Sequence, residues 1–182
     1  MTTRLELTQT WLDSAFGILA DNLHGLTLQE ALFVPPGGYR SILGTLKHTA
    51  AWSHVYRSYA FEPTPTSWPG VAWPHGLRDT VVPSDAYLAD VIAWLQLADQ
   101  LWQQDLSRIQ DADLDLLRPV HWRELRPLLD TVCRVAYHYV YHAGEINQLL
   151  SICRQEAWEE GEEVEENLIP SDGHRVVPPW RR

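Results

Sequence analysis

The sequence places two histidines four residues apart, at positions 138 and 142, in the stretch "VAYHYVYHAGEIN". If this stretch is helical, residues i and i+4 lie one above the other, so both imidazoles can reach one point. Glu145 follows His142 by three residues on the flank of that face. Neutral imidazole is a good ligand for several divalent transition metals, so the pair predicts part of a metal site. The alternative is a pair that arises by chance.

A third histidine, His48, shares a stripe with mostly apolar residues at steps of three and four. The stripe consists of Thr45, His48, Trp52, Val55 and Tyr59. This spacing predicts that His48 faces the interior, where an imidazole costs free energy unless it is partnered. A cation shared by His48, His138 and His142 would partner all three and leave a coordination position open to water or substrate. The alternative for His48 is a core histidine that bonds a carbonyl or a tyrosine hydroxyl.

Glu145 is the predicted catalytic residue, because it can orient a ligand imidazole or accept a proton at the metal. The alternative is a salt bridge with a nearby arginine. The other histidines are expected to be surface or local hydrogen-bonding groups: His24, His54, His75, His121 and His174. Cys133 and Cys153 would be about 30 Å apart on one helix, so they are expected to be separate, buried thiols.

Helical periodicity predicts the elements that position these residues. Apolar residues recur at helical spacing over residues 3–23, 39–61, 84–109 and 125–155. The expected fold is therefore all-α, a four-helix bundle with a long proline-rich loop between the second and third helices. No credible strand pair is expected in the chain, and the short pieces "RVV" and "TVV" could form a minor pairing at most. The predicted domains are a bundle over residues 1–155 and an acidic, proline-rich arm over 156–182, packed on the bundle or on a partner.

Composition narrows the class of protein further. The chain has 182 residues and a net charge of −10, which disfavours binding to nucleic-acid phosphates. No run approaches eighteen apolar residues and the N-terminus lacks the pattern of a signal peptide, so no membrane partner is expected. The few cysteines fit a reduced, cytoplasmic protein. Nine tryptophans, seven tyrosines and the extended arm favour a homodimer.

Two segments, "ILGTLKHTAAWSHVYRSY" and "HYVYHAGEINQLL", resemble the DinB/YfiT-like family, and "GEEVEENLIPSDGHRVVPPWR" resembles the tail of some members. The resemblance covers most of the chain. Its strongest motifs are the histidine near the start of the second helix and H-x-x-x-H-x-x-[EQ] in the fourth. The resemblance implies a four-helix bundle with a metal triad at His48, His138 and His142, and an association into dimers.

The resemblance also implies a class of activity, because family members with assigned activities are thiol-dependent transferases and isomerases that use bacillithiol, mycothiol or glutathione. The expected function is a metal-dependent enzyme that transfers a thiol to a small electrophile or isomerises it. The implied cofactors are a divalent metal, with Zn or Ni ahead of Fe or Mn, and a low-molecular-weight thiol cosubstrate. The alternatives are a metal-dependent hydrolase and a non-catalytic metal-binding or scaffold protein. The sequence names neither the metal nor the small-molecule substrate.

Overall fold

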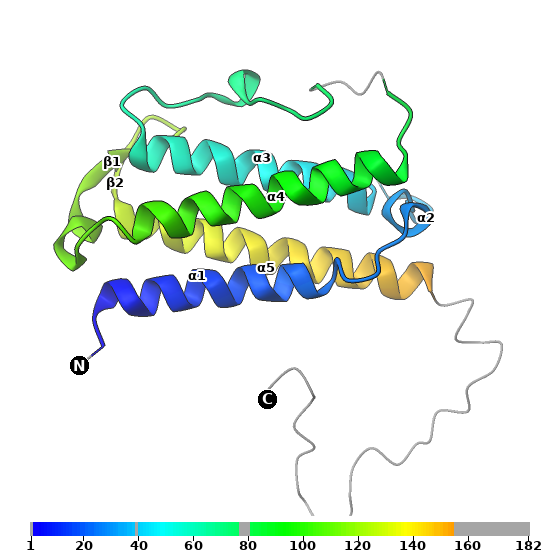
Figure 1. Cartoon of the computed structure of the whole chain (residues 1–182), viewed down its shortest axis with the longest axis horizontal. Coiled ribbons are helices and arrows are strands. Elements are labelled where there is room, and N and C mark those ends of the chain that lie inside the picture. The colour runs from blue at the N-terminus through cyan, green and yellow to red at the C-terminus, as the bar shows by residue number, and fades with distance from the viewer. Residues whose placement is uncertain (1, 39, 77–80, 155–182) are drawn as a thin grey trace, which may run out of the picture.

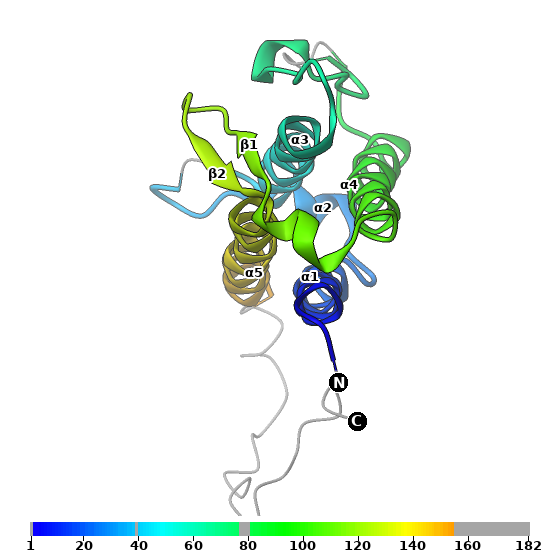
Figure 2. The same ribbon diagram turned by 90° about the vertical axis from the view of Figure 1, so that its left-hand side faces the viewer.

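The computed structural model describes residues 2–38, 40–76 and 81–154, and these are mostly helical. The helices are α1 (Arg4–Asp21), α2 (Leu28–Ala31), α3 (Ile42–Phe61), α4 (Asp85–Leu106) and α5 (Leu128–Cys153). The four long helices α1, α3, α4 and α5 lie side by side, and α2 crosses one end (Figure 1, Figure 2). The prediction of an all-α class is therefore confirmed. The predicted arm over 156–182 lies outside the described residues.

Hydroxyl side chains at the N-caps set where the helices begin. Thr3 accepts a hydrogen bond from the backbone N–H of Glu6 at the start of α1, and Ser84 does the same at the start of α4. Ser41 accepts from the backbone N–H of Gly44, so α3 begins at Ile42 rather than at the predicted residue 39. Each cap satisfies a backbone donor that the first turn leaves without a partner, typically worth about 1 kcal/mol.

One apolar core lies between the four long helices and fixes how α3 faces α5. Side chains with no more than 1% exposure come from every long helix: Leu12, Leu19, Leu46, Ala50, Leu95, Trp102, Val132 and Tyr139. The predicted seam of the last helix is buried from Leu128 to Leu149, and His142 belongs to it. Burial of a large apolar side chain contributes roughly 1.5–3 kcal/mol, so this core holds the two helices in register.

The connector between α4 and α5 differs from the prediction. It contains a 3-10 turn, η2 (Asp111–Asp115), and an antiparallel pair of short strands, β1 (Leu117–Pro119) and β2 (Leu125–Pro127). The predictions of no strand pair and of a helix from residue 125 were therefore wrong. Pro127 disfavours the helical conformation of the residue before it, so Arg126 stays extended. The helix α5 therefore begins at Leu128. Arg123, with φ of 69°, makes the turn between the strands.

The segment that follows α3 packs back onto the helices through its tryptophans. It contains a 3-10 turn, η1 (Trp68–Gly70). The Trp68 ring lies 4.8 Å from the ring of Trp52 on α3, and Trp73 lies 5.4 Å from Trp94 on α4. These aromatic contacts anchor a segment that has little backbone pairing of its own.

The described chain also bears on the predictions about the two cysteines and about membrane-spanning helices. Neither Cys133 nor Cys153 forms a disulfide, but the prediction that both thiols are buried was wrong, because both are only partly buried. No helix in the described ranges combines the length and the apolar character needed to cross a bilayer.

Asp99 is a buried carboxyl group on α4 whose charge should reduce stability. Its side chain is 7% exposed, Oδ1 has no hydrogen-bond partner among the described residues, and burial raises its pKa to about 7. The unfolded chain ionises near pH 4, so the folded state binds the extra proton between about pH 4 and 7 and loses stability as pH rises through that window. Asp99→Asn is therefore expected to stabilise the protein at pH 8 by about 1 kcal/mol or more.

Urea unfolding at pH 5 and pH 8 measures this effect. The gain from Asp99→Asn should shrink at pH 5, where the native carboxyl is already protonated. Asp85→Asn serves as a control, because Asp85 is an exposed acid in the first turn of the same helix. Its effect should be small and equal at both pH values, and an equal response of the two variants would contradict the prediction.

Candidate metal centre

Three histidines predicted from the sequence meet between α3 and α5. His48 projects from α3, and His138 and His142 project from successive turns of α5. One ring nitrogen from each residue lies within 4.8 Å of the others, and Nε2 of His138 is 3.0 Å from Nε2 of His142. Nitrogens bound to one tetrahedral zinc at 2.0–2.1 Å would be separated by about 3.3 Å. The donor set therefore fits a single divalent ion with small side-chain movements.

Burial keeps these imidazoles neutral, which is the form that binds metals. The pKa of His48 falls to about 4, chiefly through burial and then through the charge of Arg40. The pKa of His138 falls to about 3 through burial, with smaller contributions from His142 and His48. Burial also lowers the pKa of His142, although Glu145 opposes this shift. Near neutral pH the three lone pairs are consequently available to a cation.

Glu145 contacts a histidine of the trio rather than an arginine. Its Oε2 lies 2.7 Å from Nδ1 of His142. A carboxylate accepts a hydrogen bond from the Nδ1–H group of a neutral imidazole, which leaves the Nε2 lone pair of His142 directed at the other two histidines. Among the described residues, the partner of Glu145 is His142 and not an arginine, so the structure does not support the alternative of an arginine salt bridge. A role for Glu145 in catalysis itself stays a prediction.

Aromatic rings form the wall behind His48. The Trp52 ring lies 6.4 Å from the imidazole of His48, as expected one turn along α3, and the Trp68 ring from η1 lies 6.0 Å away. Trp52 and Trp68 also contact each other. The sequence indicated Trp52 through its spacing. Trp68, twenty residues from His48 in a segment without periodicity, suggested that the segment packs onto the helices but did not indicate His48 as its neighbour.

A pocket of about 480 Å³ opens in front of the trio. Besides the three histidines and Glu145, its lining contains Arg40, Tyr56, Arg134, Tyr137 and Tyr141. Sequence reasoning did not assign a site role to any of these five. Tyr137 and Tyr141 are 68% and 61% exposed. Helical spacing could have suggested Arg134, which lies one turn before His138, but arginines are common on exposed helix faces.

The alternating tyrosines of α5 divide between the pocket and the core. Tyr139 is fully buried, as its seam position predicted, and its hydroxyl lies 2.6 Å from Oγ of Ser53. It does not line the pocket. Tyr137 and Tyr141 point to the other side of the helix, because residues two apart on a helix do not share a face.

The remaining described histidines do not join the trio. His54 stacks on Trp94, and His75 stacks on Tyr87 and pairs with a carboxylate of α4. His24 is exposed. His121 is more enclosed than predicted, because it packs against Trp52 from the strand connection, with ring centroids 4.6 Å apart. His174 lies outside the described residues.

Comparisons with known proteins agree with this geometry at the level of the family. A family model described as "DinB superfamily" matches residues 12–146. The match spans most of the chain and includes α3 with His48 and the part of α5 that carries His138, His142 and Glu145. The chain has no match among curated proteins or among solved structures.

Proposed function

Because the chain belongs to the DinB superfamily, we propose that it is a metal-dependent enzyme whose metal is held by His48, His138 and His142. The observation that carries this proposal is the convergence of three neutral imidazoles, within 4.8 Å of one another, at the floor of an open pocket. We also propose that the four long helices form the four-helix bundle of the family and that the chain acts as a cytoplasmic homodimer. The exposed apolar side chains Leu7 and Ile18 on α1 support the association.

The proposed metal is a divalent transition ion, with zinc or nickel ahead of iron or manganese. Three nitrogen ligands suit several of these ions, and they leave at least one coordination position for a ligand that enters from the pocket. A closed structural site would instead have four protein ligands, and the described residues provide a cluster of only three. This difference favours a catalytic over a purely structural metal.

The proposed reaction is transfer of a low-molecular-weight thiol to a small electrophile, or a thiol-assisted isomerisation. A bound divalent metal supplies a Lewis acid that favours the thiolate form of the cosubstrate at neutral pH. Glu145 holds the imidazole of His142 in the tautomer that presents Nε2. Arg40 and Arg134 place positive charge beside the pocket, where it attracts anionic groups. Trp52 and Trp68 exclude water from the rear of His48.

Metal analysis and a thiol titration test the proposal together. Protein purified without a nickel column should contain close to one equivalent of a transition metal or take it up on titration. After replacement by Co²⁺, a small thiol such as N-acetylcysteamine should produce a new sulfur-to-cobalt charge-transfer band. Metal binding without any response to thiols would favour the non-catalytic scaffold or the hydrolase. Absence of metal uptake would contradict the proposal as a whole.

A further inference from the structure

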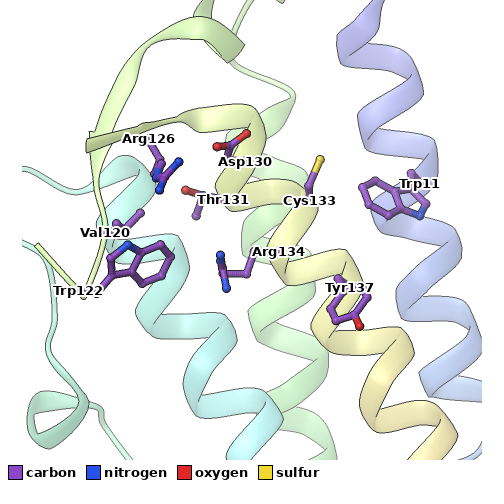
Figure 3. Close-up of a pocket in the computed structure, with 9 residues that line it drawn as sticks. All are labelled: Trp11, Val120, Trp122, Arg126, Asp130, Thr131, Cys133, Arg134 and Tyr137. Carbon is purple, nitrogen blue, oxygen red and sulfur yellow. The ribbon is translucent and has the colours of Figure 1, made fainter. Parts of the chain in front are cut away.

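A second pocket, of about 430 Å³, lies beside the pocket of the trio, along the outer face of α5 (Figure 3). Its lining comes from α1, from the strand pair and from the first three turns of α5: Trp11, Val120, Trp122, Arg126, Asp130, Thr131, Cys133, Arg134 and Tyr137. Arg134 and Tyr137 line both pockets. The two cavities therefore adjoin at these two side chains, and we refer to them together as the groove.

The Arg134 guanidinium is held in place at this boundary. Its Cζ lies 4.5 Å from the centre of the Trp122 ring, and Figure 3 shows it reaching from α5 toward that ring. It also lies near the hydroxyl of Tyr56, which belongs to the pocket of the trio. Stacking on an aromatic ring orders the planar fork of an arginine without using its N–H donors.

No carboxylate of the described residues neutralises Arg134. The ion pairs in these ranges involve other arginines, including Arg126, which lies 2.7 Å from Glu124. Arg126 thus brings its own counter-ion to the groove, whereas Arg134 does not. An oriented guanidinium without a protein counter-ion is suited to bind a carboxylate in a bidentate manner.

Thr131 is a buried polar residue in the wall of the second pocket. Its side chain lines the second pocket three residues before Arg134 on α5. The residue is only 2% exposed, and its Oγ1 has no hydrogen-bond partner in the described chain. A threonine in a helix ordinarily satisfies its hydroxyl with the carbonyl of the preceding turn. A buried hydroxyl without a partner costs free energy, and because Oγ1 is enclosed it does not itself face the pocket.

We propose that the groove binds one elongated, carboxylate-bearing small molecule, with its carboxylate on Arg134 over Trp122 and its other end at the three histidines. Arg134 precedes His138 by one helical turn and His142 by two, which corresponds to about 6 and 12 Å along the helix axis. The ligand therefore carries its carboxylate roughly 6–12 Å from the group at the trio. This inference rests on the proposed function for the metal end only. The carboxylate belongs either to the thiol cosubstrate or to the electrophile that accepts it.

Calorimetric titration of the zinc-loaded and zinc-free protein with three probes tests the inference. Glutathione is a thiol with carboxylates, pimelate is a dicarboxylate without a thiol, and N-acetylcysteamine is a thiol without a carboxylate. Arg134→Gln should weaken binding of glutathione, pimelate or both at least tenfold, and should leave N-acetylcysteamine unaffected. Arg134→Lys keeps the charge but lacks the planar fork. Its affinity for the carboxylate probes should therefore lie between those of the unmodified protein and of Arg134→Gln. Dependence limited to glutathione identifies the thiol as the source of the carboxylate, and dependence limited to pimelate identifies the acceptor.

Arg123→Gln is the matched control, since it removes the same charge from the exposed turn next to Trp122 without touching either pocket. It should bind the probes like the unmodified protein. The inference is overturned if the unmodified protein binds neither carboxylate probe, or if Arg134→Gln binds both with unchanged affinity. Zinc content measured in the same samples separates the two proposals. Binding of pimelate to zinc-free protein that depends on Arg134 would support the anion site even where the metal site fails.

Discussion

Replacement of His142 by alanine is expected to lower the affinity for metal by more than about a hundredfold, which abolishes binding in practice. Loss of a residue that only hydrogen-bonds a ligand histidine already costs about 10–100-fold, and loss of the ligand itself should cost more. His142 is the most buried member of the trio, at 4% exposure, and its Nε2 lies 3.0 Å from Nε2 of His138. The variant removes one of three nitrogen ligands and leaves Glu145 without its partner. Competition against a chromogenic zinc indicator measures the affinity.

His75→Ala is the control for this substitution. His75 stacks on Tyr87 with ring centroids 4.1 Å apart and bonds Asp90, so its loss also removes an imidazole with local contacts. It should leave zinc affinity unchanged. Circular dichroism must show that His142→Ala keeps its helices, and His142→Gln, which fills more of the space, provides a second variant. One equivalent of zinc bound with unchanged affinity in both His142 variants would exclude this residue as a ligand.

Glu145→Gln is expected to weaken zinc binding by roughly 10–100-fold, the range typical for partners of ligand imidazoles. The Glu145 carboxylate accepts a hydrogen bond of 2.7 Å from Nδ1–H of His142. A glutamine amide can donate there instead, and that arrangement favours the tautomer whose Nε2 carries the proton and cannot bind a metal. The Co²⁺-substituted variant should also show altered ligand-field bands, a change that loss of global stability alone would not produce.

Asp130→Asn is the matched control for Glu145→Gln, because it removes an exposed carboxylate from the same helix, two turns before His138 and outside the pocket of the trio. Its zinc affinity and cobalt spectrum should equal those of the unmodified protein. If Glu145→Gln behaves in the same way, the contact with His142 has no influence on the site. Glu145 would then be a partner in a surface interaction, as one reading of the sequence allowed.

Much of the candidate site follows from local sequence, because helical geometry relates residues that are close in the chain. The i, i+4 spacing of His138 and His142 sets their common face, and the i, i+3 spacing places Glu145 within reach of His142. The stripe on α3 that ends at Tyr59 correctly indicated that Trp52 stands next to His48. Side chains such as Ser41 and Ser84 carry the capping chemistry that begins the helices.

Contacts between segments that are distant in the chain could not be predicted from residue spacing. The approach of His48 to His138 joins residues ninety positions apart, and it depends on how α3 and α5 pack against a shared core. Periodicity predicts which face of each helix is buried, but not which helix it meets. The family resemblance supplied that pairing in advance, and the tertiary structure shows it directly.

The proposed anion site also combines local features of the sequence with contacts between distant segments. The sequence by itself determined the helices, their buried faces and the local histidine–glutamate motif, since hydrogen bonding and side-chain spacing within a helix are short-range. Only the tertiary structure brought Trp122, from the loop between β1 and β2, against Arg134 of α5, and Trp68 from η1 against His48. Such contacts depend on the free energy of burying surfaces from separate elements, which residue spacing along the chain does not encode.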